Sequence, residues 1–248
     1  MKVAVSIFGQ LRGDRETWVS LQKYLIDYLK ADVFVHSWLT YEDKYYASNL
    51  EKNIDDTKEN NDKILWFERQ ILRQKSIMNN LIDFLSIIKP IEIKLDKQII
   101  FDSDKYFMGN KTLWNEIISF QNSASQSYSR MKSIELITNY EISNNFKYDV
   151  IYQIRSDILL NNFIGLIKKN GIYTNNLDTI FYGDRNSMIE LSKFFIEYVK
   201  NCNINSFILP LWHMERQIMN FINNKKLTII EVKMPTNQHG IKRINNVG

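Results

Sequence analysis

Cysteine is almost missing from this chain: Cys202 is the only one among 248 residues. A single cysteine excludes an internal disulfide framework and a multi-cysteine metal site, and it is typical of a reducing compartment. Three prolines and eight glycines provide no material for a flexible linker. We therefore expect one domain over residues 1–248.

Long apolar runs are absent as well. No stretch approaches the roughly 18 apolar residues that a membrane-spanning helix needs. The start MKVAVSIFGQL has one lysine and no cleavage site, so it predicts a first strand rather than a signal peptide. We expect a cytoplasmic protein without a membrane span, either free or resting on the inner face of the cytoplasmic membrane.

The chain has no long block of one charge. Lysine and arginine number 32 against 28 acidic residues, which leaves a net charge of +4. Because the basic residues are scattered among acidic ones, nucleic acid is not an expected partner. A modest surplus suits an enzyme for an anionic small molecule or a protein on an anionic membrane. HExxH, CxxC and P-loop patterns are missing, which excludes zinc proteases, zinc fingers and Walker-type sites.

Short apolar runs do alternate with amphipathic segments. Residues 2–8 and 31–38 are typical of buried strands, and the residues between them recur at helical spacing after Asp14, which suits an N-cap. This strand–helix–strand order predicts a parallel pair and the α/β class. Further strands are expected at 90–100, 149–160 and 227–232, and a strand followed by a turn at 179–187, after a short segment at 171–176. Helices are expected at 64–88, 113–145, 188–199 and after Pro210. The serine-rich middle of 113–145 leaves one helix or two open.

Two polar segments predict loops. Residues 41–63 are charged throughout and form either a lid over substrate or a plain surface loop. Residues 236–248 are polar and predict a flexible C-terminal tail.

The segment DVIYQIRSDILL carries charge at the end of an apolar strand. Arg155 and Asp157 alternate with Ser156, so we expect the two charged side chains on one face. Ligands of open α/β sheets bind beyond the carboxyl ends of strands, where Asp157 suits a divalent cation and Arg155 a phosphate. The alternative is an Arg155–Asp157 ion pair that merely ends the strand.

Four short motifs together resemble bacterial glycosyltransferases of the GT-A kind, in particular small capsule and lipopolysaccharide (WavE-like) transferases. They are SxxGQLR at Ser6–Arg12, DVFVHSW, YDxIYQIRSD and FYGDRxxM. The resemblance implies one Rossmann-like GT-A domain, with a mostly parallel central sheet flanked by helices. It also implies transfer of a sugar from a nucleotide-sugar to a glycan or lipid-linked glycan at the cell surface.

The same resemblance assigns candidate residues. Arg155–Ser156–Asp157 falls where GT-A enzymes carry a DxD motif that grips the diphosphate through Mn²⁺ or Mg²⁺, but the first aspartate is replaced by arginine. Arg155 is therefore expected to meet the diphosphate and Asp157 to be a metal ligand. Lys132 is expected in the helix that packs under the donor nucleotide. The alternative for Lys132 is a solvated helix face.

Candidate catalytic groups follow in the second half of the chain. Glu215 is the candidate base that would deprotonate the acceptor if the enzyme inverts the sugar, and His213 the second metal or phosphate contact. Asp184 is the other candidate catalytic carboxylate. The alternatives are an N-capping role for Asp184, a helix-dipole role for Glu215 and a half-buried polar role for His213.

The stretch SIFGQLRG completes the proposed pocket. It lacks the third glycine of GxGxxG, so it is not a dinucleotide fingerprint. As a strand-end turn it places Gly9 and Gln10 against a base or ribose, and Arg12 against an anion; the alternative is a tight turn that only starts a helix. His36, at the end of the second strand, is a further candidate contact. Two other functions stay open: a non-catalytic nucleotide- or sugar-binding module, and a polysaccharide phosphotransferase.

Overall fold

The computed structural model describes nine segments of the chain. They are residues 1–11, 13–38, 81–97, 99, 114–167, 169–174, 179–200, 214–232 and 236–241; the side chains of 114–122, 198–200, 214–216 and 236–241 are outside this description. The predicted loop at 41–63 and the first part of the predicted helix at 64–88 lie outside the described residues. Residues 81–88 are helical.

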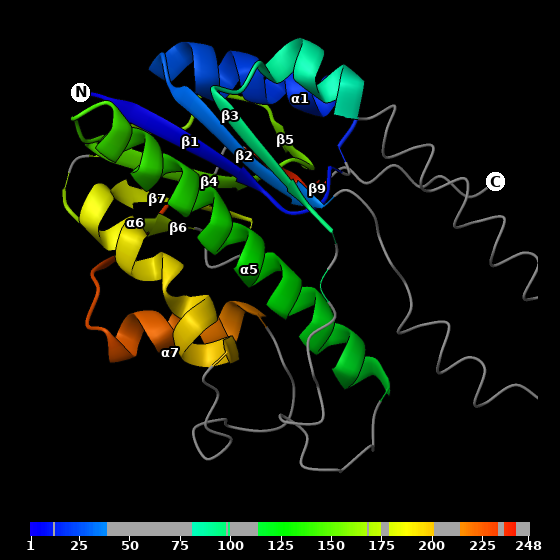
Figure 1. Ribbon diagram of the computed structural model, residues 1–248, viewed down its shortest axis with the longest axis vertical. Coiled ribbons are helices and arrows are strands. Elements are labelled where there is room, and N and C mark those ends of the chain that lie inside the picture. Colours follow the sequence, from blue (N-terminus) through cyan, green and yellow to red (C-terminus); the bar gives the residue numbers. More distant parts are fainter. Residues whose placement is uncertain are drawn as a thin grey trace, which may run out of the picture.

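A seven-stranded sheet forms the centre of the molecule (Figure 1). Across the sheet its strands are β3 (Glu92–Asp96), β2 (Asp32–Trp38), β1 (Val3–Phe8), β4 (Val150–Arg155), β7 (Ile180–Asp184), β6 (Ile172–Thr174) and β8 (Ile229–Glu231). The first four run parallel, β7 is antiparallel to β4 and to β6, and β6 and β8 are parallel. The α/β class and the mostly parallel central sheet are confirmed.

Helices cover both faces of the sheet (Figure 1). One face carries α1 (Arg15–Leu21), the π-helical η1 (Gln22–Asp27) and the helix at 81–88. The other carries α5 (Trp114–Ser143), α6 (Arg185–Ser192), η2 (Phe195–Lys200) and α7 (Met214–Asn224). Asp14 is the N-cap of α1, as predicted, and accepts the Thr17 N–H at 2.8 Å.

The alternation of side chains along β1 divides the core into two layers. Val5 and Ile7 pack in the cluster that contains Trp18, on the α1 side. Ala4 packs in the cluster that contains Ile137, on the α5 side. Because β1 is buried on both faces, its sequence VAVSIF is apolar except for Ser6 rather than alternating.

The serine-rich segment forms one helix, not two. Ser127 and Ser133 donate to carbonyl oxygens of their own helix, those of Ser123 and Arg130, so the hydroxyls are satisfied without interrupting α5. All three serines are buried.

The predicted end of the strand at 149–160 is wrong. DVIYQIRSDILL is not a single strand: β4 ends at Arg155, Ser156 and Asp157 form a turn, and β5 (Ile158–Leu160) leaves the main sheet. Within the tail predicted at 236–248, β9 (Thr236–Ile241) pairs antiparallel with β5 in a second, two-stranded sheet, and residues 242–248 lie outside the described residues.

Candidate functional site

The strand order places a topological switch point between β1 and β4. From β1 the chain crosses to β2 on one side, whereas β4 joins on the other side. Phe8 and Arg155 are register partners at the carboxyl ends of the two strands. Ligands of open α/β sheets bind in the crevice outside such a point.

The loop after β1 and the turn after β4 are in direct contact at the switch point. The Ser156 hydroxyl donates to the Gln10 carbonyl oxygen at 2.8 Å. Gly13 packs so closely on the same turn that a Cβ there would lie 2.3 Å from the Ser156 carbonyl oxygen and 2.5 Å from Trp18 Nε1. Gly9 has φ +91°, a conformation that favours glycine. Gly9 and Gln10 thus lie beside the Arg155–Asp157 turn, while Arg12 is outside the described residues.

Arg155 and Asp157 bind each other. The guanidinium Nε and Nη2 donate to Oδ1 and Oδ2 of Asp157 at 2.9 and 2.6 Å, and Asp157 is only 1% exposed. A bidentate pair of this kind is the stronger form of ion pair, and it offsets the cost of burying the carboxylate. The ion-pair alternative is therefore the arrangement observed.

The role of Asp157 as a metal ligand stays a prediction, and in this structure its carboxylate is engaged by Arg155. Both of its carboxylate oxygens already accept hydrogen bonds from Arg155, and the side chain is buried. No group of three or more His, Cys, Asp or Glu side chains in the described part of the chain is placed to hold a metal ion. As it stands in this structure, the Asp157 carboxylate binds Arg155 through both oxygens.

His36 joins the ends of three parallel strands to α5. Its Nε2 lies 3.1 Å from Oδ2 of Asp96 at the end of β3, and its Nδ1 lies 2.7 Å from the Ser129 hydroxyl on α5. That hydroxyl also accepts the Gly9 N–H at 2.7 Å. His36 is 0% exposed and does not offer an edge to a ligand, so it supports the site from beneath.

The protonation of His36 follows from its burial. Burial lowers the pKa of His36 below its usual value, although the hydrogen bond and charge of Asp96 oppose the shift. The pKa of Asp96 is also lowered: burial opposes this shift, but His36 and Lys94 favour the carboxylate. The ring is therefore neutral at pH 7, with its proton on Nε2 facing the Asp96 carboxylate.

Aromatic rings and lysines surround this pair. Trp38 and Tyr128 stack at 5.4 Å between ring centroids, and Tyr128 donates to Asp96 Oδ2 at 3.3 Å. Burial and the Asp96 carboxylate raise the pKa of Tyr128 to about 12, so its hydroxyl keeps its proton. Lys132 lies 5.5 Å from the Tyr128 ring and binds Glu135 at 2.6 Å on the same helix. Lys132 is thus near the aromatic pair, with its charge offset by Glu135.

Asp184 lies at the other end of the sheet. It is the register partner of Val150, the first residue of β4, whereas the switch point lies at the last residue of that strand. Its carboxylate accepts the N–H of Ser187 as the N-cap of α6 and the N–H of Gly171 at 2.8 Å. The structure does not bring Asp184 to the switch point, and its capping role accounts for its position.

The other catalytic candidates are only partly located. Residue 215 lies in the first turn of α7, but the side chain of Glu215 is outside the described residues, as is the whole of His213. Their predicted roles stay predictions.

Asp96 was missed by reasoning from the sequence. Its signal is present, because PIEIKLD ends in a carboxylate and the strand is parallel to the one that carries His36. Ser129 lies in the serine-rich middle of 113–145, where nothing in the residue spacing shows that its hydroxyl turns inward.

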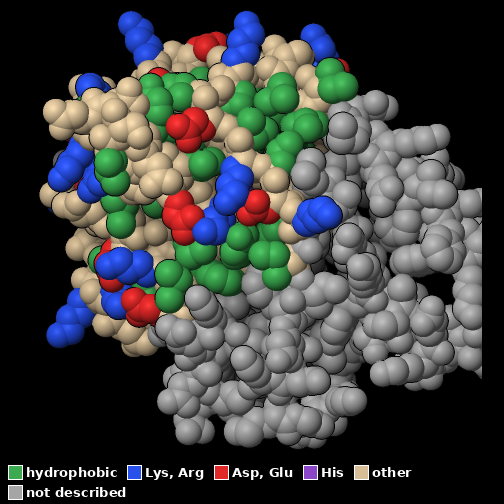
Figure 2. All heavy atoms as spheres, in the orientation of Figure 1, with side chains coloured by type: hydrophobic (Ala, Val, Ile, Leu, Met, Phe, Trp, Pro, Cys, Tyr) green, Lys and Arg blue, Asp and Glu red, His purple; other side chains and the backbone are tan. Residues whose placement is uncertain are grey.

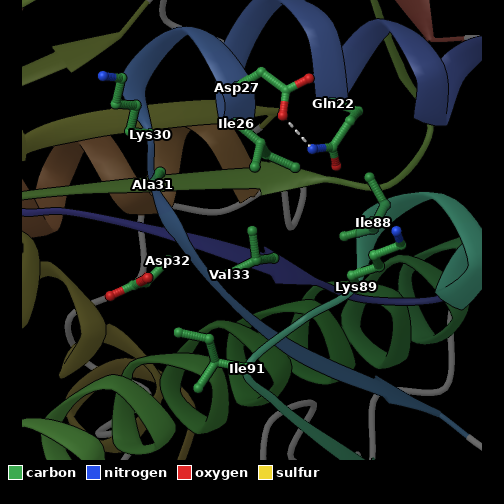
Figure 3. Close-up of a pocket in the computed structure, with 10 residues that line it drawn as sticks. All are labelled: Gln22, Ile26, Asp27, Lys30, Ala31, Asp32, Val33, Ile88, Lys89 and Ile91. Atoms are coloured by element: carbon green, nitrogen blue, oxygen red, sulfur yellow. Dashed lines mark hydrogen bonds between the residues drawn. The ribbon is translucent and has the colours of Figure 1, made fainter.

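A shallow pocket of about 380 Å³ lies elsewhere, at the start of β2. Figure 3 shows Ile26, Val33 and Ile91 around it, with Lys30 and Asp32 turned away from the centre. It is at the edge of the sheet opposite the switch point and contains none of the candidate residues.

The described residues on the face in Figure 2 form no continuous basic groove. On the face in Figure 2, basic and acidic side chains of the described part are interspersed among apolar and neutral ones. Among the residues that the structure describes, no helix combines the length and apolarity needed to cross a membrane.

Comparison with known proteins adds no further assignment. No family model matches the chain, and no curated protein matches it.

Proposed function

We propose that this chain is a glycosyltransferase that binds a nucleotide-sugar at the switch point between β1 and β4 and transfers the sugar to a glycan or lipid-linked glycan acceptor. The observation that carries the proposal is the contact between the two motif segments. The Ser156 hydroxyl of IRSD donates to the Gln10 carbonyl oxygen of SIFGQLR at 2.8 Å, at the carboxyl ends of adjacent parallel strands.

The chemistry of the edge supports an anionic ligand with a sugar or base. Gly9 and Gln10 lie at this edge, with the Gly9 N–H bound to Ser129 and the Gln10 carbonyl oxygen bound to Ser156, and the Arg155 guanidinium, paired with Asp157, lies on the turn beside them. A nucleotide-sugar has both a diphosphate and polar rings, so it uses charge and hydrogen bonds together. A GT-A domain is part of this proposal; the α/β sheet with a carboxyl-edge switch point is compatible with it.

The proposal does not route the diphosphate through Asp157 and a cation. Because Asp157 is committed to Arg155, the guanidinium is the group proposed to face the diphosphate, while Asp157 fixes its orientation. Binding of nucleoside diphosphates is therefore expected without added Mn²⁺ or Mg²⁺.

One observation favours a second candidate, a nucleotide- or sugar-binding module without turnover. The only aspartate of the IRSD turn is buried in an ion pair, so this turn provides no carboxylate to an acceptor or a metal. The two candidates predict the same ligand and differ in turnover.

Thermal-shift measurements separate ligand binding from chemistry. The purified chain is incubated with UDP-, GDP-, CMP- and dTDP-sugars, each with Mn²⁺ and with EDTA. A ligand that binds the folded state raises the melting temperature by mass action, by an amount that grows with its concentration. Absence of a shift with every donor, in both conditions, would overturn the proposed site.

Release of nucleotide then tests turnover in the presence of glycan acceptors. Release of nucleoside diphosphate supports the transferase, binding without release supports the module, and release of nucleoside monophosphate indicates a phosphotransferase. A binding shift that requires Mn²⁺ would contradict the part of the proposal that assigns the diphosphate to Arg155.

Glu215 is the proposed acceptor base. Glu215→Gln is expected to lower kcat at least about 100-fold, the lower end of a general-base contribution, while leaving donor affinity within about twofold. Equal losses in kcat and donor affinity would instead assign Glu215 to binding.

A further inference from the structure

We propose that Asp96, His36 and Ser129 form a relay of hydrogen bonds whose task is to position Gly9 and Gln10, at the start of the loop after β1, for ligand binding at the switch point. The relay runs from β3 through β2 to α5 and ends on the Gly9 N–H after β1. The ligand part of this inference rests on the proposed function; the positioning of the loop does not.

A nucleophilic role for Ser129 does not fit the geometry. Asp, His and Ser in this order form the hydrogen-bond chain of many hydrolases, in which the serine must reach the substrate. Here Ser129 is 0% exposed and its oxygen accepts the Gly9 N–H at 2.7 Å. The serine therefore faces the protein backbone instead of a substrate, so it is a positioning residue.

The protons of the relay can be assigned one by one. Asp96 accepts from Nε2–H of the neutral His36 ring, which leaves Nδ1 as an acceptor for the Ser129 hydroxyl at 2.7 Å. The His36 carbonyl oxygen is a second acceptor for the same hydroxyl, at the longer distance of 3.1 Å. The serine oxygen then keeps its lone pairs for the Gly9 N–H. Each hydrogen-bond donor of the relay has an acceptor, so removal of one member leaves a buried polar group without its hydrogen bond.

The loop is held at two adjacent points from opposite sides. Ser129 accepts the Gly9 N–H, and Ser156 donates to the Gln10 carbonyl oxygen at 2.8 Å. Gly9 has φ +91°, and no atom of the described residues lies within 4 Å of where a Cβ would be, so no side-chain packing holds it on that side. The hydrogen bond to Ser129 supplies that restraint.

Ser133 provides a matched control for Ser129. It lies one turn further along α5, is also 0% exposed, and its hydroxyl hydrogen-bonds Ser6 on β1 at 2.6 Å. Ser133→Ala thus removes a buried serine hydroxyl between the same helix and the same strand, away from the loop.

Amide hydrogen exchange of Gly9, followed by NMR on the full chain, tests the positioning. Ser129→Ala is expected to speed exchange of the Gly9 amide about tenfold, which corresponds to the loss of one buried hydrogen bond. Ser133→Ala is expected to leave it within about twofold. Equal exchange of Gly9 in the two variants would overturn the inference.

A second experiment uses Asp96 at the far end of the relay, so it does not depend on whether the Ser129→Ala variant folds. Asp96→Ala is expected to speed Gly9 exchange, whereas Asp96→Asn keeps an amide oxygen that still accepts from Nε2–H and leaves exchange near that of the unmodified chain. If Asp96→Ala leaves Gly9 unchanged, the relay does not extend to β3 and the inference fails in that form.

Calorimetric titrations with UDP, GDP, CDP and dTDP as probes test the role of the relay in ligand binding. For whichever probe binds the unmodified chain, Ser129→Ala is expected to weaken binding about tenfold more than Ser133→Ala does. Equal weakening overturns the role in ligand binding. If no probe binds the unmodified chain, the proposed function fails, and the exchange measurements decide the relay by themselves.

Discussion

Asp157 depends on one partner for its burial. Its two carboxylate oxygens bind the Arg155 guanidinium, and the side chain of Arg155 is itself only 15% exposed. Removing one partner of a buried pair leaves the other charge uncompensated, which costs far more than the pair contributes as a whole. We therefore expect Asp157→Ala to lower the free energy of unfolding by about 3 kcal/mol, measured by urea denaturation.

This expectation differs from that for a metal ligand, whose removal would abolish activity and leave the fold intact. Glu190→Gln is the control, because Glu190 pairs with the exposed Lys193 and its loss should cost less than about 1 kcal/mol. If the Asp157→Ala variant were as stable as Glu190→Gln but inactive, Asp157 would have a catalytic role instead of a structural one.

Gly13 is the residue at which the loop has least room. A Cβ would lie 2.3 Å from the Ser156 carbonyl oxygen, a backbone atom that cannot move without displacing the turn after β4. Gly13→Ala is expected to destabilise the protein by about 1–3 kcal/mol and to weaken nucleotide binding, because it separates the two sides of the switch point. Gly9→Ala, where space is open but φ is +91°, serves for comparison in the same denaturation and titration experiments.

At the scale of the element, Asp184 determines where α6 begins. Its carboxylate accepts from the Ser187 N–H at 3.1 Å and from the Ser187 hydroxyl at 2.7 Å. Burial opposes the shift, but these bonds and the Gly171 N–H hold the pKa of Asp184 below its usual value.

Removal of this cap is expected to affect stability rather than chemistry. Asp184→Ala should cost about 1–2 kcal/mol in thermal or urea unfolding, whereas Asp184→Asn, which also caps helices, should retain most of that. Nucleotide release by folded protein should be unchanged in both variants. Loss of release in a fully stable Asp184→Ala would show that Asp184 acts in catalysis after all.

Elements whose cause is local were predicted well from the sequence. The cap at Asp14, the parallel pair of β1 and β2, and the strand at Glu92–Asp96 all follow from side-chain pattern within a few residues. The end of β4 could not be predicted from the sequence, because Ile158–Leu160 continues the apolar pattern of the strand. It leaves the main sheet to pair with β9, which lies about eighty residues further along the chain, as the register of Ile158 and Ile241 shows.

At the scale of the whole molecule, topology accounts for what could be predicted of the site. Carboxyl ends of parallel strands meet at one edge, so Gly9, Gln10, His36 and Arg155 were expected together, and the described residues place them there. The sequence does not show which side chains at that edge pair with one another. Residue spacing does not determine side-chain directions. It therefore could not show that Asp157 binds Arg155, or that Ser129 faces Gly9 and not solvent.

The stability of the whole molecule should depend on pH through this edge. In the folded protein burial lowers the pKa of His36 below 6.5, so the unfolded chain binds more protons than the folded one as the pH falls through about 6.5. The stabilising effect of the neutral ring is therefore present at neutral pH and is lost on acidification. The lowered pKa of Asp96 acts in the same direction, but at lower pH, since its ordinary value is 3.8.

We expect the free energy of unfolding to fall between pH 7.5 and pH 5.5, with a contribution from His36 of at most about 1.4 kcal/mol per pH unit, the value for one proton. Urea denaturation at a series of pH values measures the slope. His36→Gln does not titrate, so its slope should be shallower even though its stability at pH 7.5 is lower, because it loses the Asp96 and Ser129 bonds. The comparison of slopes, rather than of absolute stabilities, isolates the titration from the lost contacts. An unchanged slope in His36→Gln would mean that the folded protein holds His36 at its ordinary pKa, and the neutral relay would then be wrong.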